Sequence, residues 1–189
     1  YKWTYIDDRG KWYLRSKSYY SFGSSLHSVL QRFHDEGDTG VVTTEQAVAA
    51  LEESWIQAGY SSQDEMMQAT SEGKAIVEKY VEAVATLPVT ARTLYVEKQL
   101  RVDLGPFVLL GRLDRVDQHE DGTIEVVDYK SGRGTVSAED VANDLAMECY
   151  QLLLRFHFPD SNVVASIIAL RSGDKATSGF TNEEAEQFK

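Results

Sequence analysis

Two short segments decide the fold: residues 111–117 read GRLDRVD, and residues 126–132 read VVDYKSG. Each places an acidic residue, Asp114 or Asp128, inside a stretch of strand-forming residues. Aspartate is depleted in strands, and an ionised carboxylate there is costly unless it is paired or bound to a metal. The two segments therefore indicate neighbouring strands that carry a polar site.

The connection between these strands determines whether the two acids meet. A two-residue turn would pair Asp114 with Tyr129 and point its side chain away from Asp128. A three-residue loop at 120–122, with Gly122 in the left-handed conformation, places Asp114 directly opposite Asp128. We expect the three-residue loop, which brings both carboxylates to one face of the hairpin.

By strand alternation Lys130 shares that face, and two carboxylates with a lysine are what phosphodiester hydrolysis needs. Carboxylates bind hard divalent cations such as Mg²⁺ or Mn²⁺, and a bound cation lowers the pKa of a coordinated water. The lysine can orient that water or neutralise the phosphate. The alternative is a salt-bridge cluster of aspartate and lysine on a strand. Both segments together, at this spacing, favour the metal site.

Hydrophobic periodicity places these strands within a larger architecture. Apolar residues recur at helical spacing before the two segments and follow strand patterns around them. Helices are expected at residues 24–35, 44–58, 62–86 and 139–157, and strands at 93–103, 107–118, 123–130 and 163–170. This order, helices and then β-β-β-α-β, predicts an α/β or α+β sandwich around a mixed sheet.

Length and composition indicate one domain. The chain has 189 residues, of which 42% are hydrophobic, which suffices for a sizeable core. Within the domain 1–189 we expect a helical part at about 20–90 and a catalytic sheet core at about 91–172. The start at Tyr1 rather than a methionine suggests a piece of a longer protein. The single cysteine, Cys149, excludes an internal disulfide. The sequence also has no apolar run long enough to span a membrane. Together with the single cysteine, this predicts that the protein resides in the cytoplasm.

The net charge of −11 does not favour DNA binding, because non-specific affinity for DNA comes mainly from lysine and arginine side chains that neutralise phosphates. A local basic surface, or metal ions bound at a carboxylate cluster, would have to reverse the field near the site.

The two segments resemble motifs of the PD-(D/E)XK nucleases, in the branch of RecB-type and AddB-type nuclease domains and the nucleases of CRISPR adaptation. GRLDRVD is similar to the G-x-x-D-R-(I/V)-D motif of that branch, and VVDYKSG is similar to its V-V-D-Y-K-(T/S)-G motif. The resemblance implies a restriction-endonuclease-like core in which Asp114 and Asp128 are metal ligands and Lys130 is the catalytic lysine. The backbone carbonyl of Tyr129 is expected to complete the metal shell.

Two further positions extend the resemblance to the metal site. Residues 22–27, FGSSLH, resemble the G-x-x-x-H element of the branch, whose histidine contributes to the metal site. His27 would then add a nitrogen ligand, which favours Mn²⁺ over Mg²⁺; a partly buried histidine without a metal is the alternative. Glu97 lies where the family commonly has a glutamate, and an exposed strand charge is its alternative.

A late helix supplies candidate substrate contacts. Tyr150-Gln151-Leu152 resembles the Q-L-x-x-Y element that faces the substrate, which implies a catalytic role for Gln151 and a substrate contact for Tyr150. This chain has Arg155 where the element has tyrosine. Arg112 and Arg133 are further candidates for phosphate contacts. A polar surface without a role is the alternative.

The resemblance implies a metal-dependent DNA nuclease, with exonuclease activity expected, in DNA repair, recombination or CRISPR-type DNA processing. A helicase or another subunit outside this chain is the protein partner that it suggests. Residues 1–5 resemble a stretch that follows the first of four iron–sulfur cysteines in some members, but one cysteine supports no cluster within this chain. Two alternatives remain: an inactive nuclease fold that binds DNA or protein, and an acidic protein-interaction domain.

Overall fold

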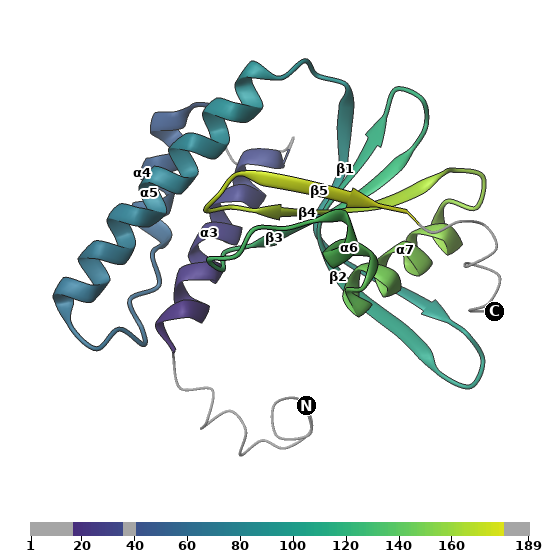
Figure 1. The fold of residues 1–189 in the computed structure, drawn as a ribbon, viewed down its shortest axis with the longest axis horizontal. Coiled ribbons are helices and arrows are strands. Elements are labelled where there is room, and N and C mark those ends of the chain that lie inside the picture. Colours follow the sequence, from purple (N-terminus) through teal and green to yellow (C-terminus); the bar gives the residue numbers. More distant parts are fainter. Residues whose placement is uncertain (1–16, 36–40, 180–189) are drawn as a thin grey trace.

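A mixed sheet lies between two layers of helices (Figure 1). The computed structural model describes residues 17–35 and 41–179, so the stretch 1–5 compared above lies outside the described residues. One layer contains helices α3 (Ser18–His34), α4 (Thr44–Ser54) and α5 (Gln63–Thr86), and the other contains α6 (Ala138–Ala142) and α7 (Leu145–His157). This α/β architecture confirms the predicted fold class.

The sheet has five strands in the spatial order β1-β2-β3-β4-β5. Strands β1, β2 and β3 form an antiparallel meander, β4 is parallel to β3 through the α6–α7 crossover, and β5 is antiparallel to β4. Their bounds are Ala91–Asp103, Val108–His119, Ile124–Lys130, Val163–Ala169 and Asp174–Ser178. The last strand was not predicted, because its polar sequence DKATS shows no apolar alternation.

The two faces of the sheet support two hydrophobic cores. Val127 and Tyr129 of β3 pack into the core shared with α3, α4 and α5. Ile124 and Val126 belong to the core under α6 and α7. Since side chains alternate along a strand, β3 is buried on both faces, and only its last residue, Lys130, is exposed.

Three helices differ from their predicted bounds. Helix α3 begins at Ser18 rather than residue 24, so Gly23 lies inside the helix, where it faces the Ser131 side chain. The predicted helix 139–157 is broken, since Asp144 accepts hydrogen bonds from the backbone of α7 as its N-cap. Helix α4 also ends at Ser54, four residues before the predicted end.

The β2–β3 hairpin has the predicted three-residue loop. His119 N–H donates to Thr123 O at 2.9 Å, and Gly122 has φ 84°. Consecutive pairs follow this register as far as Arg115 and Val127. The next pair in the register would be Asp114 and Asp128, and here the recorded ladder ends.

No helix among residues 17–35 and 41–179 is both long and apolar enough to cross a bilayer.

Replacing Gly122 tests the hairpin. A Cβ at Gly122 would have no neighbour within 4 Å, so the cost of Gly122→Ala comes from the left-handed backbone alone. We expect the free energy of unfolding in urea to fall by about 1–2 kcal/mol. Gly134→Ala is the control, since that position is also open but has no positive φ, and it should lose no stability. Equal stabilities of the two variants would contradict the turn assignment.

Candidate active site

The predicted residues gather at a groove of about 680 Å³ between α3 and the ends of β2 and β3. Its wall combines titratable groups with small and aromatic side chains. The lining includes Tyr19, Tyr20, Gly23, His27, Glu97, Arg112, Asp114, Tyr129, Lys130 and Ser131.

Close packing of α3 against the end of β3 brings His27 into the groove. A Cβ on Gly23 would lie 2.9 Å from Ser131 Oγ, so a larger residue would require the Ser131 side chain to move. His27 follows four residues later, on the same helix face. Its Nε2 lies 3.0 Å from Tyr129 O, and its Nδ1 lies 3.4 Å from Asp114 Oδ1. The spacing of the glycine and the histidine thus has a geometric cause.

Asp114 occupies the point where β2 parts from β3. The Tyr129 N–H donates to Asp114 Oδ2 at 2.9 Å, so a side chain accepts the hydrogen bond that a strand partner would otherwise accept. This bond fixes the carboxylate while its second oxygen, Oδ1, faces His27. The backbone N–H at the end of β3 is therefore hydrogen-bonded, and the groove stays open.

Glu97 reaches the same point from β1 through an unusual backbone. It is the one non-glycine residue with positive φ in the described part of the chain, at 47°. Its Oε1 lies 3.7 Å from His27 Nδ1, and its Oε2 accepts from Arg112 Nε at 2.7 Å. Such strain persists only where surrounding structure holds it, and it clusters at functional sites.

These three side chains form a candidate metal site. His27, Glu97 and Asp114 each offer one ligand atom, and the three atoms lie within 4.8 Å of one another. One nitrogen and two carboxylate oxygens suit a divalent cation such as Mn²⁺. With Nε2–H donating to Tyr129 O, the histidine would present Nδ1 to the ion, and the carbonyl would orient the ring.

The electrostatics agree with a site built for positive charge. Burial disfavours the charged form of His27, but hydrogen bonds to Asp114 and Glu97 raise its pKa to about 10. The imidazolium thus supplies positive charge beside the two carboxylates when no metal is bound.

Asp128 lies beside this site rather than inside the three-residue cluster. Its Oδ2 lies 2.8 Å from Lys130 Nζ, so the carboxylate is paired with that ammonium group. Burial raises the pKa of Asp128, the Lys130 charge opposes that shift, and the Asp114 charge adds to it. The buried Asp128 carboxylate thus adds negative charge beside the three-residue cluster, and Lys130 partly balances that charge.

The family comparison covers the entire sequence. The family described as the PD-(D/E)XK nuclease superfamily matches residues 1–189. The chain belongs to the PD-(D/E)XK nuclease superfamily. A search of curated proteins finds no match. Nucleases of this superfamily use divalent metal ions, which agrees with the donor set described above.

The late-helix residues of this PD-(D/E)XK domain occupy three different environments. Gln151 is 1% exposed, and the catalytic role expected for it stays a prediction. Tyr150 lies nearer the carboxylates: burial raises its pKa to about 12, with added contributions from Asp128 and Asp114. Arg155 is half-buried, with its Nε inaccessible to solvent.

Two polar residues near the candidate site were not predicted from the sequence. Asp144, the N-cap of α7, has its Oδ2 3.9 Å from Lys130 Nζ. Arg115 is 7% exposed, and its Nη1 donates to the hydroxyls of Tyr80 and Tyr129, each at 2.8 Å. The sequence did contain a signal for Arg115: a charged residue in the middle of a predicted strand, within the segment GRLDRVD.

The same guanidinium binds His34 Nε2 at 2.6 Å. Burial, assisted by the Arg115 charge, lowers the pKa of His34 to about 2. The neutral imidazole can therefore accept from Arg115, and the network joins α3 and α5 to β2 and β3.

Two substitutions of Glu97 distinguish the effect of its strained backbone from the effect of its carboxylate on metal binding. Glu97→Gly removes a carboxylate and relieves a left-handed backbone that costs a side chain about 1–2 kcal/mol. Glu97→Gln alters the charge but keeps the strain. We expect both to weaken Mn²⁺ binding at least about ten-fold in calorimetric titrations. Only the glycine variant should match or exceed wild type in melting temperature. Unchanged Mn²⁺ affinity in both variants would remove Glu97 from the site.

Proposed function

We propose that this protein is a metal-dependent deoxyribonuclease that hydrolyses phosphodiester bonds with one or two Mg²⁺ or Mn²⁺ ions. The observation that carries the proposal is the convergence of His27, Glu97 and Asp114 beside the ion pair of Asp128 and Lys130. Membership of a nuclease superfamily supports the reaction class. The intact lysine and carboxylates argue against a fold that only binds.

We assign the metal to His27, Asp114, Glu97 and Asp128. The motif resemblance makes the Tyr129 carbonyl a further ligand, but this oxygen lies 3.0 Å from His27 Nε2, so we propose that it orients the histidine instead. A bound divalent ion would lower the pKa of its water and offset charge on the phosphate. The buried Asp128 is suited to this role because an ionised carboxylate there is costly without a cation.

Lys130 is proposed to hold the attacking water or a phosphate oxygen. Its side chain is 47% exposed at the end of β3, and it lines the groove. Burial lowers the pKa of Lys130, but the Asp128 carboxylate raises it, so the ammonium form is favoured. A charged lysine donates hydrogen bonds and is a poor ligand for a hard cation, so its role is in positioning and charge balance.

DNA contact by a chain of net charge −11 needs local cations. Arg112 is 69% exposed at the groove, although Glu97 neutralises part of its charge. Arg133 follows the catalytic strand, and Arg155 lies on α7. We assign these three arginines to phosphate contacts, with Tyr150 beside the carboxylates.

The resemblance of the two motifs to RecB-type domains supports exonuclease action in DNA repair, recombination or CRISPR-type processing. Cleavage of linear and circular forms of one DNA, with and without Mn²⁺, tests this directly. An exonuclease degrades the linear form and spares the circle. Metal-dependent cutting of both would identify an endonuclease, and binding without cutting would favour an inactive module.

Replacing Lys130 tests its role. Lys130→Ala should reduce kcat at least about 100-fold and leave Mn²⁺ affinity within a few-fold, because the lysine is not a ligand. Lys74→Ala is the matched control, since Lys74 pairs with Glu52 away from the groove and should retain full turnover. Near wild-type turnover in Lys130→Ala would contradict the proposed role.

A further inference from the structure

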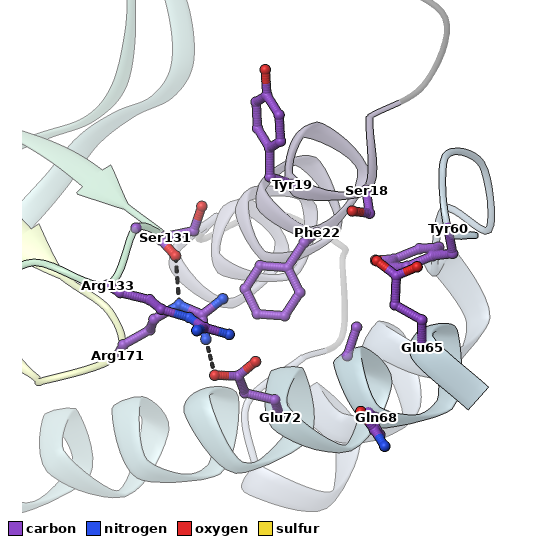
Figure 2. Close-up of a pocket in the computed structure, with 12 residues that line it drawn as sticks. Ser18, Tyr19, Phe22, Tyr60, Glu65, Gln68, Glu72, Ser131, Arg133 and Arg171 are labelled. Atoms are coloured by element: carbon purple, nitrogen blue, oxygen red, sulfur yellow. Dashed lines mark hydrogen bonds and ion pairs between the residues drawn. The ribbon is translucent and has the colours of Figure 1, made fainter. Parts of the chain in front are cut away.

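A second hollow adjoins the proposed active site (Figure 2). It encloses about 460 Å³ between the start of α3, the first half of α5 and the turn after β3. Tyr19, Ser131 and Gly132 line both this hollow and the catalytic groove, so the two are continuous. We call it the Tyr19 pocket.

The Tyr19 pocket begins within two residues of the proposed catalytic lysine. Ser131 and Gly132 directly follow Lys130, and Arg133 is the next residue in the chain. Consecutive Cα atoms are about 3.8 Å apart, so the Cα of Arg133 lies at most about 11 Å from that of Lys130. Successive nucleotides of a stacked strand are about 3.4 Å apart along the axis. A strand cut beside Lys130 would therefore place its adjoining nucleotides at this pocket.

One wall of the pocket carries two guanidinium groups (Figure 2). Arg171 is fixed: its Nε donates to Ser131 O at 2.8 Å, and its guanidinium carbon lies 4.5 Å from the Phe22 ring centroid. It also forms an ion pair with Glu72. Arg133, by contrast, is exposed and makes no ion pair or hydrogen bond with another residue of the described ranges. This guanidinium is available for a phosphate.

The acidic side chains of the pocket are already engaged. Glu65 accepts hydrogen bonds from the Ser61 backbone and hydroxyl, and Glu72 pairs with Arg171. The Glu72 charge is therefore offset by Arg171, whereas Glu65 keeps its negative charge and its oxygens are occupied by the Ser61 donors. Among the described lining residues, Arg133 is the cation without an ion-pair partner.

The other walls offer surfaces for a base. Tyr19 is 56% exposed where the groove and the pocket meet. Its ring centroid lies 4.3 Å from that of Tyr20 and 5.6 Å from Lys17 Nζ, so a base here would add to an aromatic pair beside a cation. Base stacking on an aromatic ring is tolerant of sequence, because every base has a π-face. Gln68 lines the floor, and its amide can donate to or accept from a base edge. The pocket volume suits one nucleotide rather than a base pair.

We propose that the Tyr19 pocket is a subsite for one unpaired nucleotide next to the scissile phosphate, with its base on Tyr19 and its phosphate on Arg133. The subsite rests on the proposed nuclease function for its biological meaning. Its occupancy by a nucleotide can be measured without any turnover.

Filling the pocket is the decisive test. Gln68 is exposed, so Gln68→Trp adds bulk to the floor without removing a core contact. Met67→Trp is the matched control: the neighbouring side chain is 60% exposed and does not line the pocket. Binding of a fluorescein-labelled single-stranded oligothymidylate is followed by anisotropy in EDTA. We expect Gln68→Trp to bind about ten-fold more weakly than wild type, and Met67→Trp to bind within about two-fold.

Further variants at Tyr19 and Arg133 test the subsite without relying on the introduced tryptophan of Gln68→Trp. Tyr19→Ala should weaken binding by a similar factor, whereas Tyr19→Phe, which keeps the ring, should restore it. Arg133→Ala should reduce the salt dependence of binding by about one phosphate contact. Wild-type affinity in folded Gln68→Trp and Tyr19→Ala would overturn the subsite, as would failure of wild type to bind the oligonucleotide.

Turnover decides the proposed function separately. Cleavage of the same oligonucleotide is measured after adding Mn²⁺. Binding that is sensitive to Gln68→Trp without cleavage would refute the nuclease and retain the subsite. Cleavage by wild type and by Gln68→Trp with equal KM would retain the nuclease and refute the subsite.

Discussion

The hydrogen bond from Tyr129 N–H to Asp114 Oδ2 holds the candidate site at the end of the β2–β3 ladder. Regular pairing ends at Arg115 and Val127, and the carboxylate satisfies the next strand N–H. A buried backbone N–H without an acceptor would be costly. The Asp114 carboxylate supplies that acceptor, so it stabilises the point where the two strands separate. It also leaves Asp114 Oδ1 facing His27, where a cation can bind.

The buried polar network behind the site keeps this geometry in place. Arg115 lies between the hydroxyls of Tyr80 and Tyr129 and forms an ion pair with Asp117 at 3.0 Å. Burying a guanidinium costs several kcal/mol unless it is paired and hydrogen-bonded, and here it is both. The network fixes the Tyr129 side chain on one face of β3, while its backbone serves the metal site. Tyr129 therefore links the buried network that stabilises the fold to the geometry of the candidate metal site.

The sequence predicted the hairpin well because local signals agreed: the loop length, Gly122 and the alternation of β3 all required one register. The predicted glycine and histidine lie one helical turn apart on α3, and His27 Nδ1 lies 3.4 Å from Asp114 Oδ1; the role of His27 as a ligand stays a prediction. The sequence left Glu97 undecided, because a left-handed residue within a strand has no local signature. It also missed the break at Asp144, where a capping carboxylate interrupts an apolar helical pattern. The Arg115 network escaped because its partners come from elements distant in sequence.

The central claim is that His27, Glu97 and Asp114 together bind a divalent cation at the point where β2 and β3 separate. Anomalous diffraction from crystals soaked in Mn²⁺ measures this most directly. The account predicts one strong peak within about 2.0–2.6 Å of His27 Nδ1 and of carboxylate oxygens from Glu97 and Asp114, with Asp128 nearby. A peak bound elsewhere, or none at this point in crystals that contain the metal, would contradict it.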